Sequence, residues 1–262
     1  MSERRPPSAE DFNQWYANMA AEKSGDEIQR RHLGLPPHLP SSSLLTWDGL
    51  AEVVEALRLR PGARLLDLAC GRGGYGLEIA ARTGATLTGV DFSSEAIAQA
   101  VALAQRLGID AEFRVGDLAD TGLPTASVDA LVCVDSIQFK SDAASFDEMH
   151  RVLAPGGRIA LTTWEALDRA DERVLALLRT VDTRSSLERA GFVDIEVREP
   201  PAWRAAERAL WEEAAGLDPG DDPALQSLHD EGVRVLPGID LTRRVLATAT
   251  ASVAAARPVE EA

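Results

Sequence analysis

The chain has 262 residues, of which 45% are hydrophobic, and this length can bury a full core in one α/β domain with appended helices. Its formal charge of −15 would repel a phosphate backbone, and no stripe of lysine and arginine with interleaved aromatic residues occurs, so we expect no nucleic-acid partner. The N-terminal segment lacks the apolar core of a signal peptide and no run of about 18 apolar residues predicts a membrane span, so we expect a cytoplasmic protein.

The first 60 residues are predicted to form a helical cap. The run Ser8-Ala9-Glu10-Asp11 has the pattern of a capping box, which starts a helix by satisfying backbone N–H groups. Thr46 is placed to cap a second helix that runs through Leu57. A loop rich in proline and serine, residues 34–43, separates the two helical patterns.

From Pro61-Gly62 onward the pattern alternates between strands and helices. Apolar runs predict seven strands, at residues 63–68, 85–90, 110–115, 128–134, 158–164, 192–198 and 242–250. Amphipathic stretches predict helices at residues 73–83, 93–107, 142–153, 167–179, 184–190, 203–215 and 223–232. Strands that are apolar on both faces and joined by helices are typical of a parallel sheet covered on both sides. We therefore predict an α/β fold with a doubly wound, mostly parallel, seven-stranded sheet.

The predicted domain organisation follows from these elements. The α/β domain spans residues 61–253, and its helical insertions lie near residues 166–190 and 203–232. An acidic, alanine-rich tail, residues 254–262, is expected to fray. The two cysteines, Cys70 and Cys133, lie in or beside apolar runs, which is typical of buried thiols in a reducing compartment, so we expect neither a disulfide nor a metal site.

A glycine cluster follows the first predicted strand and predicts a nucleoside-cofactor site. Gly71, Gly73 and Gly76 form the pattern G-x-G-x-x-G at the start of a predicted helix. Glycines allow a tight turn and let backbone N–H groups approach a ligand without an intervening Cβ. This pattern alone does not separate a nicotinamide enzyme from a methyltransferase.

Acidic residues end the first three predicted strands and favour an adenosine-containing cofactor. Asp67 ends the first strand, Asp91 ends the second, and Gly116-Asp117 follows the third. In a doubly wound sheet the carboxyl ends of the strands are where a ligand binds. Asp91 is placed to accept both ribose hydroxyls and Asp117 to accept the adenine amino group. A nicotinamide enzyme would share Asp91 but has no need of the other two acids.

Several ordered motifs resemble the class I S-adenosylmethionine-dependent methyltransferases, within the small-molecule branch that acts on ubiquinone, menaquinone and sterol precursors. The likeness covers about Leu44 to Val197 and implies a Rossmann-like methyltransferase fold with S-adenosyl-L-methionine as cofactor. One departure is Ala69, where the family usually has glycine. The motifs that carry the resemblance are Leu66-Asp67-Leu68-Ala69-Cys70-Gly71-Arg72-Gly73, Gly89-Val90-Asp91-Phe92-Ser93, Gly116-Asp117-Leu118, Val128-Asp129-Ala130-Leu131-Val132, Glu148-Met149-His150-Arg151-Val152-Leu153-Ala154-Pro155-Gly156-Gly157 and Leu187-Glu188-Arg189-Ala190-Gly191-Phe192.

The resemblance implies a role for each cofactor-site residue. Asp67 would hold the methionine ammonium group, the backbone from Ala69 to Gly73 would hold the methionine portion, and Asp91 would hold the ribose. Asp67 and Asp135 have the alternative of merely capping helices or turns. The remaining roles are packing against adenine by Phe92, contact with the base edge by Gly116, Asp117 and Leu118, and flanking of the reactive methyl by Asp135 and Ser136.

Substrate-site residues are harder to assign from the sequence. Aromatic residues of the cap and the later strands could wall an apolar substrate pocket, although they are equally suited to the core: Trp15, Tyr16, Trp47, Trp164, Trp203 and Trp211. His32 and His38 are the candidates for a general base, with plain loop histidines as the alternative. His150 and His229 are expected to be solvated surface residues. Arg30-Arg31-His32 is suited to grip a carboxylate or diphosphate, or else forms a solvated helix face.

The function that these patterns favour is methyl transfer from S-adenosyl-L-methionine to a small, apolar or aromatic metabolite, for instance in specialised biosynthesis. One alternative keeps the fold and cofactor but catalyses a cyclisation or rearrangement. A second is a nicotinamide oxidoreductase, and a third is a non-catalytic binding module with a degenerate site. The presence of acids at positions 67, 91 and 117 argues against the third.

Overall fold

The computed structural model describes residues 8–21, 24–40 and 43–252 and contains a seven-stranded sheet. The strand order is β3-β2-β1-β4-β5-β7-β6, and β7 runs antiparallel to both of its neighbours while the others are parallel. This confirms the predicted doubly wound sheet. The strands are β1 Arg64–Leu68, β2 Thr86–Asp91, β3 Ala111–Val115, β4 Val128–Val134, β5 Leu153–Ala166, β6 Phe192–Arg198 and β7 Thr242–Ala251.

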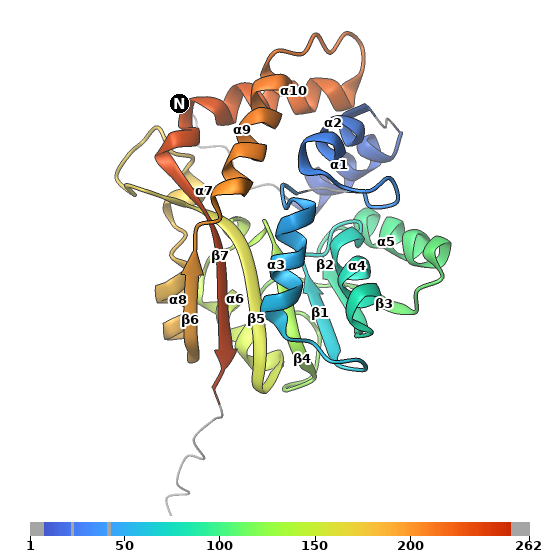
Figure 1. The fold of residues 1–262 in the computed structure, drawn as a ribbon, viewed down its shortest axis with the longest axis vertical. Helices are drawn as coiled ribbons and strands as arrows, with labels where there is room; N and C mark the ends of the chain where they lie inside the picture. Colours follow the sequence, from blue (N-terminus) through green and yellow to red (C-terminus); the bar gives the residue numbers. More distant parts are fainter. Residues whose placement is uncertain (1–7, 22–23, 41–42, 253–262) are drawn as a thin grey trace, which may run out of the picture.

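Helices cover both faces of the sheet. Helices α3, α4 and α5 lie on one face, and α6 and α8 lie on the other (Figure 1). Two apolar clusters fill the spaces between sheet and helices, as expected for strands that are buried on both sides. The helices are α1 Ala9–Ala21, α2 Ser24–Leu33, α3 Trp47–Leu57, α4 Gly74–Thr83, α5 Ser94–Leu107, α6 Ala143–Val152, α7 Ala176–Arg179, α8 Thr183–Arg189, α9 Pro201–Ala215 and α10 Pro223–Val235, with 3-10 turns η1 Ile137–Phe139 and η2 Leu236–Leu241.

Capping side chains set the helix starts that the sequence predicted. The Ser8 hydroxyl and the Asp11 carboxylate each accept a bond from the other residue's backbone N–H before α1. The Thr46 hydroxyl accepts from the Gly49 N–H at 3.0 Å and starts α3. Ser93 does the same for α5 through the Ala96 N–H.

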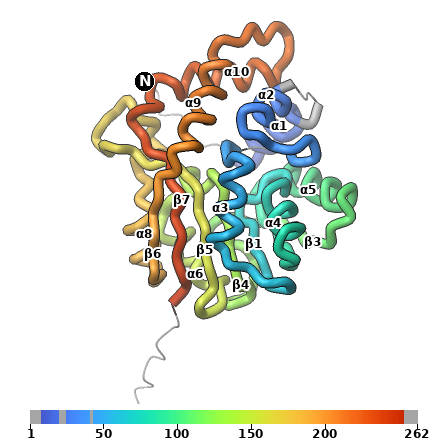
Figure 2. The backbone as a smooth tube through the Cα atoms, in the orientation of Figure 1, coloured from blue at the N-terminus to red at the C-terminus, as the bar shows by residue number. Residues whose placement is uncertain are grey.

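Four helices gather at the end of the molecule where the parallel strands finish. Figures 1 and 2 show α1 and α2 of the cap beside α9 and α10, which are inserted between β6 and β7. Arg31 of α2 pairs with Glu213 of α9 at 2.6 Å, and Asp26 of α2 pairs with Arg72 of the glycine turn at 2.8 Å. The cap therefore closes over the carboxyl ends of the strands. Within the described ranges, no helix has both the length and the apolarity that crossing a bilayer demands.

Two element predictions were wrong. The helix predicted over residues 167–179 is reduced to α7, because the Asp168 and Asp171 carboxylates accept from the backbone N–H two residues on, at Ala170 and Arg173, and hold turns instead. The last parallel strand, β5, starts at Leu153 rather than at residue 158, because Leu153 pairs with Val128 across an irregularity in the β4–β5 ladder. The predicted fraying tail lies outside the described residues, and the domain boundaries stay a prediction.

Candidate active site

The turn between β1 and α4 brings its backbone into the left-handed region at three residues. Ala69 has φ +58°, Gly71 has φ +52° and Gly73 has φ +77°. Glycine adopts this conformation without strain, whereas a side chain there costs on the order of 1 kcal/mol. Ala69 thus stands at a position where glycine is the easier residue, which gives a physical reason for the glycine that is usual there.

The third glycine of the pattern, Gly76, is required by its contact with Asp67. A Cβ at Gly76 would lie 2.4 Å from the Asp67 Oδ2 atom, which is far inside contact distance. The first turn of α4 therefore packs directly against the acid that ends β1. The Gly76 N–H also faces this carboxylate and lowers its pKa.

Asp67 is buried, with 2% of its surface exposed, and its pKa is raised to about 7. Removal from water is the main cause, and the charge of Asp91 adds to it. The protein thus holds a carboxyl group that a bound cation would ionise. An ammonium group is a cation of this kind.

Asp91 joins the second strand to the glycine turn. Its Oδ2 accepts from the Gly71 N–H at 2.8 Å and its Oδ1 accepts from the Ser93 N–H at 2.9 Å. Burial raises the pKa of Asp91, while these backbone bonds oppose the shift. The sequence prediction that the ends of β1 and β2 meet is confirmed.

Asp117 follows β3 at the same end of the sheet. The Gly116 N–H donates to the Asp91 carbonyl at 3.0 Å, and this bond keeps the β3 end beside the β2 end. The Asp117 carboxylate is half-exposed and pairs with Lys140, which follows η1, while Leu118 is buried. Sequence analysis missed the pairing of Lys140 with Asp117, because the two residues lie 23 positions apart in the chain.

Helix α1 lies over this rim. The ring of Phe12 contacts the rings of Phe92 and Phe139 at centroid distances of 5.1 and 5.4 Å. The Asn13 side chain accepts from the Ser93 hydroxyl at 2.7 Å and from the Glu95 N–H at 3.2 Å, at the start of α5. Phe92, the predicted adenine neighbour, is therefore covered by the cap.

Asp135 is part of a buried ion pair. It follows β4 with φ +53°, and its carboxylate accepts from Arg244 of β7 at 2.7 and 2.9 Å. It also accepts from the Leu44 N–H and the Thr162 hydroxyl. The neighbouring Ser136 hydroxyl donates to the carbonyl of Val134, the last residue of β4. Arg244 was missed in the sequence because the last strand carried no recognised motif.

The buried Cys133 thiol lies within electrostatic range of three of the aspartates. The charges of Asp67, Asp135 and Asp91 all contribute to raising the pKa of its thiol, with burial as the main cause. Both Cys133 and Cys70 are free thiols. In the described part of the chain no group of three or more His, Cys, Asp or Glu residues is arranged to hold a metal ion.

The histidines lie in ion pairs or against aromatic side chains. His32 contacts Glu213 of α9 at 2.6 Å, and His38 contacts Glu78 of α4 at 3.3 Å. The Arg30-Arg31-His32 cluster thus connects α2 to α9 through Arg31 and His32. The other two contacts are those of His150 with Phe192 and of His229 with Asp230. These contacts join neither His32 nor His38 to the acids at the strand ends.

The aromatic residues proposed for a substrate wall divide into three places. Trp15 and Tyr16 pack with Phe12 on α1. Trp47 lies under the guanidinium of Arg82 on α4, at 4.0 Å. Trp164 and Trp203 lie close together around Arg244, as described below.

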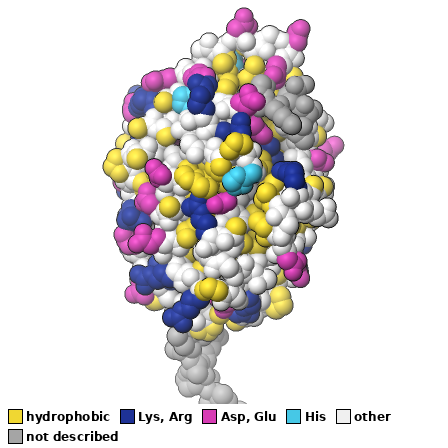
Figure 3. All heavy atoms as spheres, turned by 45° about the vertical axis from the view of Figure 1, so that its right-hand side comes forward, with side chains coloured by type: hydrophobic (Ala, Val, Ile, Leu, Met, Phe, Trp, Pro, Cys, Tyr) yellow, Lys and Arg dark blue, Asp and Glu magenta, His cyan; other side chains and the backbone are white. Residues whose placement is uncertain are grey.

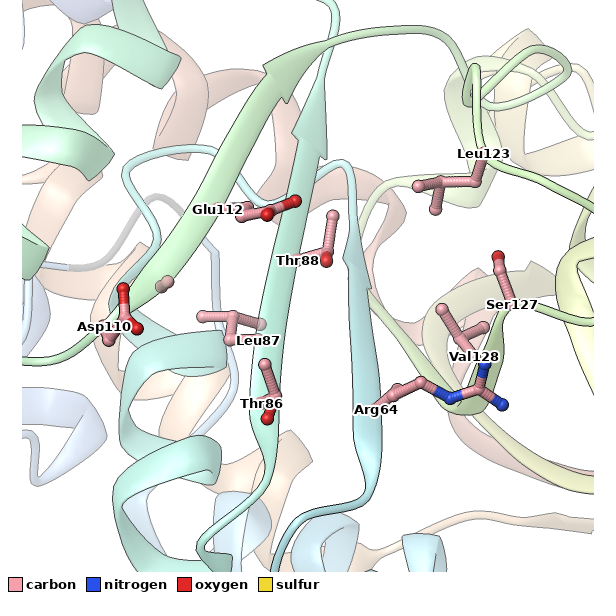
Figure 4. Close-up of a pocket in the computed structure, with 10 residues that line it drawn as sticks. Arg64, Thr86, Leu87, Thr88, Asp110, Glu112, Leu123, Ser127 and Val128 are labelled. Atoms are coloured by element: carbon pink, nitrogen blue, oxygen red, sulfur yellow. The ribbon is translucent and has the colours of Figure 1, made fainter.

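A surface cavity of about 290 Å³ lies elsewhere, at the amino ends of the parallel strands. Figure 4 shows its lining, with side chains from β1, β2 and β3 and from the segment that enters β4. Arg64, Thr86 and Val128 each begin a strand, so this cavity is at the opposite end from the acids.

On the face in Figure 3, Lys and Arg side chains are scattered among Asp and Glu.

Comparison with known proteins agrees with this geometry. Residues 65–157 match a family model described as a methyltransferase domain. The chain is 31% identical over 116 residues to a sterol 24-C-methyltransferase of Gibberella zeae, a match that covers 43% of the chain and 30% of the relative. It is 29% identical over 168 residues to the 2-methyl-6-phytyl-1,4-hydroquinone methyltransferase of Synechocystis, a match that covers 60% of the chain and 51% of the relative. The matches thus span about half or less of these relatives.

Among solved structures, the chain is similar to that of a [4+2]-cyclase, SpnF, with a TM-score of 0.69. The two share 22% sequence identity, and the match covers 95% of this chain and 98% of the other. This likeness shows the fold, including the cap and the inserted helices. The family match at residues 65–157 contains the glycine turn and the acids at the ends of β1, β2 and β3, so this part of the chain is a methyltransferase domain.

Proposed function

We propose that the protein transfers a methyl group from S-adenosyl-L-methionine to a small, apolar or aromatic metabolite. The observation that carries this proposal is the pair of buried acids, Asp67 and Asp91, that meet the glycine turn at the carboxyl ends of β1 and β2. The curated relatives act on sterols and on a prenylated hydroquinone, both of which are small and apolar.

The residues present fit this cofactor. The left-handed turn from Ala69 to Gly73 offers backbone N–H groups, and Asp67 is a buried carboxyl next to the turn with its pKa raised to about 7. Asp67 would pair with the ammonium group, and Asp91 would accept from the ribose hydroxyls. Asp117 and Leu118 would contact the adenine edge, beside Phe92.

The bound sulfonium supplies an activated methyl group, so the protein's work is positioning and exclusion of water. Helix α1 covers the rim through Phe12 and Asn13, and α9 and α10 close the same end of the molecule. Asp135, held by Arg244 and the Leu44 N–H, would flank the methyl group. A dry, enclosed site strengthens each of these polar contacts.

Calorimetric titration tests the proposal. We expect S-adenosyl-L-methionine to bind the wild-type protein, and Asp67→Asn and Asp91→Asn each to weaken binding by at least about tenfold, since each removes a charge-assisted contact. Asp129→Asn is the matched control, because Asp129 lies on β4 and pairs with Arg64 at the opposite end of the sheet. Undiminished binding by both site variants would refute the assignment, and binding of NAD(H) in place of the sulfonium would favour an oxidoreductase.

The similarity to a cyclase of the same fold calls for a second measurement. Release of S-adenosylhomocysteine with turnover of a candidate acceptor establishes methyl transfer. Product formation with the cofactor left intact would establish a cyclisation or rearrangement instead.

A further inference from the structure

A buried polar cluster lies next to Asp135 at the carboxyl end of β5. Its centre is the Arg244 guanidinium, whose side chain is 1% exposed and pairs with Asp135, which is 2% exposed. The guanidinium lies 4.2 Å from the ring centroid of Trp164 and 5.6 Å from that of Trp203. Trp164 donates its indole N–H to the Glu207 Oε1 atom at 2.8 Å. Residues from β5, β7 and α9 therefore contact one another around the buried Arg244 guanidinium.

Several polar atoms of this cluster have no hydrogen-bond partner. They are Nε and Nη1 of Arg244 and Oε2 of Glu207, and all are buried. Arg204 is 3.6 Å from a Glu207 oxygen, which is too far for a hydrogen bond. Buried polar groups in native proteins are nearly always satisfied, so such a concentration marks a place where a group from outside the chain completes the bonding.

The unpartnered atoms have complementary roles. Arg244 offers N–H donors, and Glu207 offers a carboxyl oxygen as acceptor. A hydroxyl group satisfies both kinds at once, because its oxygen accepts and its hydrogen is donated. An ether accepts but cannot donate, and it would leave Glu207 unsatisfied.

The cluster is also on the side of the site where an acceptor belongs. Asp135, to which Arg244 is bonded, is the residue expected to flank the reactive methyl group. Helix α9, which carries Glu207 and Trp211, is part of the cover over the strand ends. The surrounding side chains of Trp164 and Trp203 suit an apolar ring.

On these observations, and resting on the proposed function, we infer that Arg244 and Glu207 form a subsite that binds a hydroxyl group on an aromatic acceptor. Arg244 donates to the hydroxyl oxygen and Glu207 accepts its hydrogen. The substrate class is therefore a phenol or a similar ring-bound hydroxyl compound.

The test compares two ligands that differ by one hydrogen-bond donor. 1-Naphthol and 1-methoxynaphthalene are titrated calorimetrically into the full chain saturated with S-adenosylhomocysteine. We expect the wild-type protein to bind 1-naphthol at least about tenfold more tightly, because only the hydroxyl satisfies Glu207. Equal affinities, or no binding of 1-naphthol to a protein that binds S-adenosylhomocysteine, would overturn the subsite.

The variant Glu207→Gln distinguishes a preference that comes from hydrogen bonding from one that comes from the size of the ligand. Its amide can keep the bond from Trp164 while presenting N–H groups to the subsite, so the preference for 1-naphthol should disappear. A preference that persisted in this variant would come from the size of the methoxy group and would overturn the inference. Glu165→Gln is the matched control, since Glu165 is equally buried but is fully bonded by Thr183 and Arg243; this variant should keep the wild-type preference.

A failure of this subsite can be told apart from a failure of the proposed function. Binding of S-adenosylhomocysteine is measured first and alone, and its absence would count against the cofactor site. The wild-type comparison of the two naphthalenes needs no variant, so it remains decisive even where a substitution prevents folding. Thermal unfolding of each variant establishes that the comparison is made on folded protein.

Discussion

Two aspartates on neighbouring strands have opposite electrostatic surroundings. Asp67 on β1 is buried beside Asp91, which raises its pKa to about 7. Asp129 on β4 is half-exposed and accepts from the Arg64 guanidinium, which lowers its pKa. The Asp67 carboxyl group is thus largely un-ionised below about pH 7, whereas the arginine favours the ionised form of Asp129 at the other end of the sheet.

Asp67 should therefore make the protein less stable as the pH rises. Its folded-state pKa exceeds that of the unfolded chain, so the folded state binds more protons between about pH 4 and pH 7, and its contribution to stability is lost across that range. Relative to Asp67→Asn, the wild-type protein should lose up to about 4 kcal/mol of unfolding free energy between these pH values. Denaturant unfolding at several pH values measures this difference.

Asp129→Asn is the control for this experiment, because its effect on the free energy of unfolding should change with pH in the opposite direction. Its folded-state pKa is lowered, so the wild-type protein should lose stability relative to this variant as the pH falls. A pH-independent difference between the wild-type protein and Asp67→Asn would contradict the burial of an un-ionised carboxyl group at the end of β1.

At the scale of elements, two side chains attach helix α1 to α5: Asn13 of α1, and Gln99 of α5, whose amide donates to the Tyr16 carbonyl at 3.0 Å. The Asn13 carbonyl oxygen accepts from both the Ser93 hydroxyl and the Glu95 N–H. Among the described residues, the adjacent Gln14 is bonded to Asn18 of the same helix. Replacing Asn13 therefore removes a contact between α1 and α5, whereas replacing Gln14 removes a contact inside α1.

Asn13→Ala should loosen α1 without disturbing the sheet. Losing these bonds costs about 1–2 kcal/mol, and local opening should become about tenfold more frequent. Hydrogen exchange followed by mass spectrometry should show faster exchange across Ala9–Ala21 and unchanged exchange in β1 and β4. Gln14→Ala should leave α1 as protected as in the wild-type protein; equal loosening by both variants would contradict a specific docking role for Asn13.

Element boundaries were predictable where a local signal existed. Thr46 and Ser93 cap helices that start at the expected residues, since capping needs only neighbouring backbone. The helix predicted over residues 167–179 failed because aspartates at 168 and 171 bonded their own backbone in turns, a competition that amphipathic patterning does not register.

At the scale of the whole molecule, net charge should govern the response to salt. The chain carries 42 acidic residues against 27 lysines and arginines, and this excess repels itself in the compact state. Raising the salt concentration from about 0.01 to 0.15 M shortens the screening length from about 30 to 8 Å. At pH 7 we expect the melting temperature to rise by about 2–4 °C, equivalent to about 1 kcal/mol.

Calorimetry near pH 4.7, the isoelectric point, provides the comparison. There the net charge is close to zero, so added salt should leave the melting temperature almost unchanged. A salt effect of the same size at both pH values would show that self-repulsion is not its cause.

The sequence by itself determined the sheet and the acids that gather at the carboxyl ends of its strands. Apolar runs, glycines and the acids at positions 67, 91 and 117 are adjacent in the chain to the turns that they build, so local pattern was sufficient for them. Only the tertiary structure decided the other partners, namely Lys140 beside Asp117, Arg244 beside Asp135 and α1 over Phe92. Arg244 lies more than a hundred residues from Asp135, and no periodicity specifies which charged side chain the antiparallel β7 will bury against β4 and β5. Such pairings arise from packing of the whole chain, which is why the buried pair of Arg244 and Asp135 became visible only in three dimensions.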